Sequence, residues 1–361
     1  MFKVNTKNEH IKRRFFIWLK EAGGCCDSTI ANIEKAILLY EDFTEQADFA
    51  TFKAQKAIEF KKSLIKRRYR DKNISLTTYC TYLRHLRKFF IWLTSQTGYR
   101  SKITPDIVDY LKISEKEERI AMQSIPRSFP PLEYVLNLTG SIKINSEIDK
   151  RDRALIAFTL LSGMRDKAIA TLPLGCFDET TLTISQNPRR GVETKFSKYI
   201  QTTLTKFNDT LFDYLMEWIK HLKNKGFSSQ DPLFPRSKNE QGENNLSFET
   251  ASEVEPVYWR GTGRIREIFK KRSEEASLPY FAPHTFRHLA FEQALKACKS
   301  GEHIKAISQN FGHEHIATTL SSYANYTPDR LSQIISNMDF SGKKPKDENS
   351  KLEAIKKLID S

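Results

Sequence analysis

Four residues near the end of the chain have the chemistry to bind one anion, move a proton and supply a nucleophile: His284, Arg287, His313 and Tyr323. A guanidinium is permanently charged, an imidazole exchanges protons near neutral pH, and a phenol attacks once it is activated. Each residue alone also fits a structural role, such as a helix cap, a half-buried tyrosine or a salt bridge. What they do together depends on the elements that position them.

The first two of these elements are predicted to be short helices. Thr285 can cap the first helix, which places Arg287 on its first turn and His284 beside the same anion. Apolar residues at helical spacing predict a second helix over residues 301–310, and Gly312 can terminate it in the left-handed conformation.

A third short helix is expected to follow His313, which then lies on a turn. Ile316, Leu320 and Tyr323 recur at i, i+4 and i+7, so the phenol shares a face with two core residues. The ordered pattern His-x-x-Arg-His, Gly-His, and a tyrosine behind a Thr-Thr pair resembles the second half of the active-site signature of the tyrosine recombinases, the phage-integrase family.

That family also has an earlier arginine, and the sequence contains a match. An apolar run over residues 155–161, with Asp149 as a plausible helix cap, leads into Leu-Ser-Gly-Met-Arg165. This segment resembles the Leu-x-Gly-Leu-Arg box of the family, so Arg165 corresponds to its first arginine. The family usually has a glutamate three residues later; here that position is Ala168, and Asp166 is the nearby acidic residue.

The family's catalytic lysine lies on a β-hairpin. Residues 181–185 and 199–204 read as strands on either side of a polar turn that contains glycine. The segment Lys-x-x-Lys within this turn resembles the family's lysine strand. Lys195 therefore corresponds to the catalytic lysine, and Lys198 is the alternative.

The resemblance implies six catalytic residues: Arg165, Lys195, His284, Arg287, His313 and Tyr323. The arginines would bind the nonbridging phosphate oxygens, the histidines would share the phenol proton, and the lysine would protonate the leaving 5′ oxygen. The tyrosine would form a 3′-phosphotyrosine, so neither metal nor ATP is expected. The tyrosine lies ten residues after the second histidine where nine is commoner, and Tyr326 is the alternative nucleophile.

Composition agrees with a polyanionic partner. The chain of 361 residues carries a formal net charge of +14, and its pI is about 9.4. No stretch approaches the roughly 20 apolar residues of a membrane span, and the N-terminus lacks a signal-like apolar segment. Five cysteines without a C-x-x-C pair indicate reduced thiols in a cytoplasmic protein.

The fold class expected is mainly α with a small β-hairpin or sheet, in two domains. Residues 1–113 read as a helical domain that looks like the family's core-binding domain, 114–131 as a linker, and 132–340 as the catalytic domain. The polar segment 237–255 reads as a loop, and 341–361 as a flexible tail with a possible short helix. Basic residues of the helical domain are expected to hold DNA phosphates: Lys66, Arg67, Arg68, Arg70, Arg84, Arg87 and Lys88.

The predicted function is a site-specific DNA recombinase, an integrase or transposase of a mobile element. Its partners would be double-stranded DNA, further copies of the chain in a synaptic tetramer, and accessory recombination proteins. A type IB topoisomerase and a catalytically inactive DNA-binding protein are the alternatives. A metal-dependent nuclease is disfavoured, because no cysteine or carboxylate is spaced to complete a site with His284 and His288.

Overall fold

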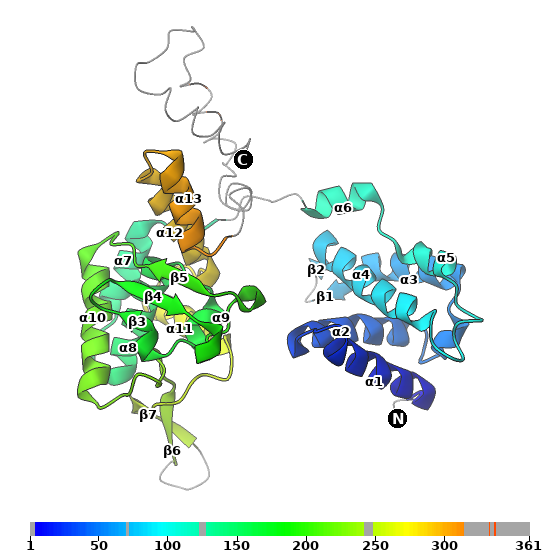
Figure 1. Cartoon of the computed structure of the whole chain (residues 1–361), viewed down its shortest axis with the longest axis horizontal. Helices are drawn as coiled ribbons and strands as arrows, with labels where there is room; N and C mark the ends of the chain where they lie inside the picture. The colour runs from blue at the N-terminus through cyan, green and yellow to red at the C-terminus, as the bar shows by residue number, and fades with distance from the viewer. Residues whose placement is uncertain are drawn as a thin grey trace. The chain divides into compact units, whose positions relative to one another are not determined.

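The computed structural model describes residues 4–69, 72–122, 128–241 and 248–313, together with residues 332 and 336. The chain forms two compact units, Met1–Ile125 and Pro126–Ser361, which are shown in Figure 1. Within the described residues, helices dominate and the strands form small antiparallel sheets, as the sequence predicted. No described helix combines the length and apolarity needed to cross a membrane.

The first unit is helical and has an aromatic core. Its elements are α1 (Thr6–Glu21), α2 (Asp27–Phe43), η1 (Phe49–Thr51), α3 (Ala54–Lys66), β1 (Arg68–Tyr69), β2 (Lys72–Asn73), α4 (Leu76–Leu93), α5 (Pro105–Val108), η2 (Asp109–Leu111) and α6 (Glu115–Met122). Ser75 caps α4 by accepting a hydrogen bond from the Thr78 amide. The rings of Phe52 and Phe90 stack with centroids 3.9 Å apart, so α4 is anchored through its apolar stripe.

The segment predicted as a linker, residues 114–131, begins with helix α6 and contains the boundary between the two units. Ser114 and Glu117 form a reciprocal capping box: the Ser114 amide donates to the Glu117 carboxylate at 3.0 Å, and the Glu117 amide donates to the Ser114 hydroxyl. Glu118 then pairs with Arg84 on α4 at 2.7 Å. The prolines and mixed charge of this segment led to its interpretation as a linker, although Ser114 and Glu117 have the spacing of a capping box. Helix α6 packs against α4 within the first unit.

The second unit packs helices around α8 and carries the strands beside them. Its elements are α7 (Leu132–Ser141), α8 (Glu147–Ser162), α9 (Asp166–Ala170), η3 (Leu174–Cys176), β3 (Phe177–Asp178), β4 (Thr183–Gln186), η4 (Pro188–Arg190), η5 (Lys195–Ser197), β5 (Ile200–Thr203), α10 (Asp209–Asn224), β6 (Ser237–Gln241), β7 (Phe248–Val254), α11 (Gly263–Glu275), α12 (Pro283–Lys296) and α13 (Gly301–Asn310). Helix α8 is buried along most of its length and packs against α10 and α12. It therefore forms the centre of the core.

The N-terminus of α8 differs from the prediction. Ser146, not Asp149, is the cap, because its hydroxyl accepts from the Asp149 amide at 3.2 Å. The Asp149 carboxylate instead pairs with Arg272 of α11 at 2.7 Å. The other oxygen of Asp149 accepts from the Asn145 amide at 3.1 Å and from the Ser146 hydroxyl at 2.7 Å, so Asp149 supports the helix start from the first turn.

Two strand predictions have different outcomes. The hairpin predicted on either side of residues 187–198 is present as β4 and β5, and β3 adds a third antiparallel strand that the sequence did not predict. The segment 237–255, expected as a loop, forms the antiparallel pair β6–β7, with Ser237 opposite Val254. This hairpin projects from the unit (Figure 1), and its polar sequence lacks the apolar alternation that indicates a strand.

Candidate functional site

Arg287 is buried on the first turns of α12, with 7% of its surface exposed. The helix begins at Pro283, whose fixed φ suits the first helical position, and Ala282 is the N-cap residue. Thr285 is therefore not the cap that the sequence suggested. Its hydroxyl donates to the Ala282 carbonyl at 2.7 Å and reinforces the first turn from inside the helix.

The Arg287 guanidinium joins two chain segments around the site. Nη1 donates to the carbonyl of Gly163 at 2.6 Å, and Nη2 donates to the carbonyl of Phe311 at 2.6 Å. Nη2 also lies 2.9 Å from Nε2 of His313. Because arginine has only donors, His313 Nε2 is the acceptor and the ring proton resides on Nδ1. The arginine thus fixes the C-terminal ends of α8 and α13 and the tautomer of the histidine.

Two glycines make this close arrangement possible. Gly163 ends α8 with φ 56°, and Gly312 follows α13 with φ 68°, as predicted for the latter. A Cβ on Gly163 would lie 2.4 Å from the Phe311 ring, and one on Gly312 would lie 2.5 Å from Ile200. Both positions therefore exclude a side chain by backbone conformation and by space.

His313 lies in a positive electrostatic field. Burial and the charges of Arg287, Arg165 and Lys195 lower the pKa of His313 to about 4. The imidazole is therefore neutral at pH 7. Since these three cations act on one ring, the structure brings together four of the six predicted catalytic residues.

Arg165 follows the turn after α8 and is the N-cap residue of α9. The neighbouring position expected to carry glutamate in the family, Ala168, is packed with 1% exposure. Asp166, the acidic residue that directly follows Arg165, has its carboxylate 3.9 Å from the Arg266 guanidinium. Burial raises the pKa of Asp166, against the opposing charges of Arg266 and His284.

His284 is exposed on the first turn of α12, one turn before Arg287. Its ring lies 6.1 Å from that of His288. His288 stacks on Phe129 with centroids 6.4 Å apart. His288 therefore packs against an aromatic ring next to His284. Among the described residues, no group of three His, Cys, Asp or Glu side chains is placed to hold a metal ion.

Lys195 begins the short turn η5 between β4 and β5, and its side chain is exposed. The alternative lysine, Lys198, lies three residues later and lines a groove of about 530 Å³ beside His313. Both ammonium groups lie over the Phe196 ring, Lys195 at 4.9 Å and Lys198 at 5.6 Å from its centroid. The lysine whose charge acts on His313 is Lys195.

Tyr323, Tyr326 and the third predicted helix lie outside the described residues. The nucleophile assignment thus rests on the sequence pattern. The structure describes the other five predicted catalytic residues, Arg165, Lys195, His284, Arg287 and His313.

Asn310 is a residue of the site that the sequence did not indicate. Its side-chain amide makes two hydrogen bonds to Thr203 on β5: it accepts from the backbone amide at 2.6 Å and donates to the carbonyl at 3.0 Å. The Thr202 hydroxyl also donates to the Asn310 carbonyl at 2.9 Å. These bonds join the lysine hairpin to the end of α13, and no local sequence signal predicts such a tertiary contact.

The basic residues predicted to bind DNA have different surroundings in the first unit. Lys66, Arg68 and Lys88 are exposed, whereas Arg84 pairs with Glu118 at 2.7 Å and Arg87 with Asp109 at 2.9 Å. For Arg84 and Arg87 to bind a phosphate, these two ion pairs would have to break, which costs little free energy where the pair is exposed. Arg70 lies outside the described residues.

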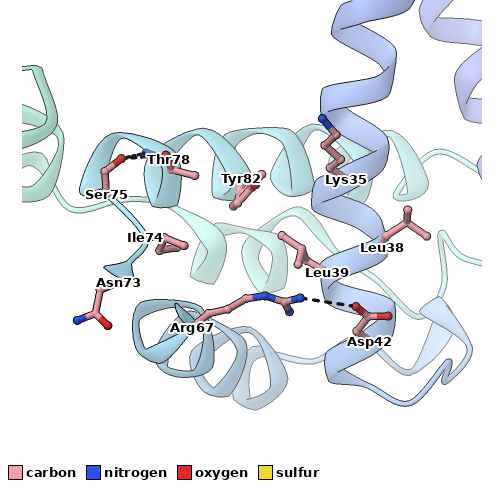
Figure 2. A pocket seen from close by; sticks show the side chains of 10 residues that line it. All are labelled: Lys35, Leu38, Leu39, Asp42, Arg67, Asn73, Ile74, Ser75, Thr78 and Tyr82. Atoms are coloured by element: carbon pink, nitrogen blue, oxygen red, sulfur yellow. Dashed lines mark hydrogen bonds and ion pairs between the residues drawn. The ribbon is translucent and has the colours of Figure 1, made fainter. Parts of the chain in front are cut away.

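Arg67 lies at the rim of a groove between α2, α4 and the β1–β2 hairpin. Figure 2 shows its guanidinium directed toward Asp42, 4.0 Å away, with Leu39, Ile74 and Tyr82 lining the interior. The groove has a volume of about 780 Å³. An arginine at the edge of an open groove remains accessible to a ligand from solution.

Comparisons with known proteins agree on one family. Residues 135–330 match the sequence profile of the phage integrase family. A search of curated proteins returns no match.

Solved structures with a similar fold include three DNA complexes. A lambda integrase(75-356) dimer bound to a COC′ core site is 14% identical, with 88% of this chain and 95% of that chain covered and a TM-score of 0.58. A Tn1549 transposon integrase in complex with a circular intermediate DNA is 17% identical, with 91% and 99% covered and a TM-score of 0.56. A lambda integrase tetramer bound to a Holliday junction is 12% identical, with 94% and 79% covered and a TM-score of 0.57. At these identities the likeness concerns the fold.

Proposed function

The chain belongs to the phage integrase family, the tyrosine recombinases, and we propose that it is the integrase or transposase of a mobile element. It cuts and rejoins DNA at specific sites through a covalent tyrosine intermediate. The observation that carries this proposal is the cationic cluster around neutral His313, formed by Arg287, Arg165 and Lys195. Such a cluster is suited to a phosphodiester and to the additional negative charge of its transition state.

The two arginines bind the nonbridging oxygens of the scissile phosphate. Arg287 is already held by the carbonyls of Gly163 and Phe311, so little conformational entropy is lost when the anion arrives. Arg165 lies two residues after Gly163, the glycine that ends α8, and reaches the phosphate from the start of α9. Planar guanidinium groups match the geometry of phosphate oxygens, which lysine cannot do.

The histidines and the lysine move protons. A bound phosphate offsets the cations around His313 and competes with Nε2 for the Arg287 donor, so the ring gains proton affinity and can share the proton of the attacking phenol. His284 contributes a second imidazole from the exposed first turn of α12. Lys195 protonates the leaving 5′ oxygen, and Lys198 is the alternative donor. Tyr323 becomes the 3′-phosphotyrosine, with Tyr326 as the alternative nucleophile.

Double-stranded DNA is the proposed substrate, and four copies of the chain assemble on two duplexes in the proposed synaptic complex. The similar folds seen as a dimer on a core site and as a tetramer on a Holliday junction support this stoichiometry. The net charge of +14 supports broad contact with phosphates. A DNA substrate, together with five cysteines in the free form, supports a cytoplasmic location, where accessory recombination proteins would join the complex.

The test is covalent capture on a suicide DNA substrate. The duplex comes from the ends of the element that flanks the gene and carries a nick, so that the cleaved end diffuses away. Wild type, Tyr323→Phe and Tyr326→Phe are resolved on a denaturing gel. An adduct lost only in Tyr323→Phe supports the proposal, and loss only in Tyr326→Phe moves the nucleophile. Absence of any adduct on DNA that is demonstrably bound would contradict catalysis and favour an architectural DNA-binding protein.

The same substrate separates recombination from topoisomerase action. A strand-exchange enzyme joins the captured 3′ end to a second duplex that offers a matching 5′-hydroxyl. A type IB topoisomerase reseals only within the original duplex. Joint molecules between two differently labelled duplexes are the expected product.

A further inference from the structure

We propose that Phe196 is a DNA wedge that inserts its ring against the base step at the scissile phosphate and partly unstacks it. The proposal rests on the recombinase function stated above and adds a base-contacting residue to the catalytic hairpin. It follows from an exposed ring, a strained turn and two flanking cations at one position.

The exposure of Phe196 has no explanation within the unit. Its side chain is 74% exposed, the highest value among the large apolar side chains that the structure describes. The residue lies on the turn between β4 and β5, and that turn also carries Lys195. Single exposed apolar side chains are common on protein surfaces, so the proposal rests on this exposure together with the turn and the charges that surround the ring.

The turn holds Phe196 in a costly backbone conformation. Its φ is 62° and ψ 24°, and Ser197 follows with φ 50°, so two consecutive residues other than glycine are left-handed. The Thr194 hydroxyl donates to the Lys198 carbonyl at 2.6 Å, and the Ser197 amide donates to the Thr194 carbonyl at 3.2 Å. These bonds close the turn and maintain the conformation. Strain of this kind, maintained by surrounding bonds, is characteristic of functional sites.

The charges around the ring identify the ligand class. The ammonium groups of Lys195 and Lys198 lie 4.9 Å and 5.6 Å from the ring centroid. An apolar protein surface would have to desolvate both lysines, whereas DNA offers a phosphate to each cation and a base to the ring. Phenylalanine wedges and aromatic stacking are established means of contacting bases. Nucleic acid is therefore the occupant that satisfies all three side chains.

The position of the ring identifies the base step. Lys195 protonates the 5′ oxygen in the proposed reaction, and its ammonium group lies 4.9 Å from the centroid of the Phe196 ring. Phe196 is therefore delivered to the base pair next to the broken bond. Unstacking this pair would help the new 5′ end to leave and the incoming strand to take its place.

The test compares paired and mismatched suicide substrates at that step. On the paired duplex, Phe196→Ala is expected to form the covalent adduct about tenfold more slowly than wild type, a difference of about 1.4 kcal/mol. A mismatch at the same step has already lost its pairing, so it should restore the rate of Phe196→Ala to near that of wild type on the same duplex. Phe196→Leu, which keeps an apolar wedge without an aromatic face, should retain most of the rate on paired DNA.

Tyr199→Ala is the matched control, because Tyr199 is also an aromatic residue on this hairpin and is 58% exposed. Its rate should not depend on the mismatch. A slow Phe196→Ala that the mismatch does not rescue would overturn the wedge and assign the ring to positioning Lys195. A rate of adduct formation by Phe196→Ala on paired DNA equal to that of wild type would also overturn it. So would a rescue of Tyr199→Ala by the mismatch as large as that of Phe196→Ala. Failure of the recombinase function itself is distinguishable, because wild type would then form no adduct on either duplex.

Discussion

Lowering the pH should leave His313 neutral long after an ordinary histidine has become charged. Burial, followed by the charge of Arg287, lowers the pKa of His313 from 6.5 to about 4. A shift of this size corresponds to about 3 kcal/mol of preference for the neutral ring. The hydrogen bond from Arg287 to His313 Nε2, at 2.9 Å, also requires a neutral ring, because a protonated imidazole has no acceptor nitrogen.

The sign of the effect on stability follows from the two states. Above pH 6.5, His313 is neutral in both the folded and the unfolded chain and contributes no pH dependence. Between pH 6.5 and about 4, the unfolded chain binds a proton at this position and the folded chain does not. Stability is therefore lost as the pH falls through this window, by up to about 3 kcal/mol from this group. His313→Gln should remove that part of the acid sensitivity.

The direct assay is a pH titration followed by NMR, with ¹³C at the Cε1 position of histidine. The spectrum of His313→Gln assigns the signal, and the other histidines serve as internal references. The expected midpoint in the free protein is about 4. In Tyr323→Phe bound to an intact duplex, the midpoint should rise by at least about one pH unit, since a phosphate offsets the surrounding cations. A midpoint at or above 6.5 in the free protein would refute the cationic cluster on which the proposed mechanism depends.

Three further predictions concern stability and DNA binding. Gly163→Ala should lower the free energy of unfolding of the second unit by about 2 kcal/mol, measured by urea denaturation, because the new methyl group meets the Phe311 ring at a left-handed position. Arg272→Met should cost about 2 to 3 kcal/mol in the same assay, because Oδ2 of the buried Asp152 loses its 2.8 Å partner while Arg151 still donates to Oδ1; a loss below 1 kcal/mol would contradict this. Lys66→Ala should weaken binding equally on all DNA sequences and reduce the slope of log K against log salt by about one, which titration of fluorescent duplexes at several salt concentrations would test.

The parts of the fold that could be predicted are those with local sequence signals. Helix α13 matches the predicted range because apolar spacing and a terminal glycine agree with each other, and the structure adds Ser300 as its N-cap. The hairpin β4–β5 was predicted for the same reason, since β-prone runs surround a polar turn that contains glycine. Arg165 and Arg287 were found through motif spacing, and the structure places both in the field around His313.

The parts that were wrong or missed depend on contacts between distant residues. Asp149 was predicted as a cap but pairs with Arg272, which is 123 residues away in the sequence. The segment 237–255 was predicted as a loop because a solvated hairpin needs no apolar alternation, yet its backbone pairs along β6 and β7. The conformation of Phe196 was not predicted, because no local sequence signal indicates a left-handed backbone at a phenylalanine.

Asn310 shows how such distant contacts serve the chemistry. Its amide pairs with both backbone groups of Thr203, as another strand would do at the free edge of β5. Because Gly312 packs on Ile200 at the same edge, the turn that carries His313 is fixed to the hairpin that carries Lys195. The His313 imidazole and the proposed general acid, Lys195, are thereby held by the same set of contacts, although one lies on a turn and the other on the short 3-10 helix η5. Catalytic groups placed on turns need this kind of support, since a displacement of about 1 Å between them is enough to slow the reaction strongly.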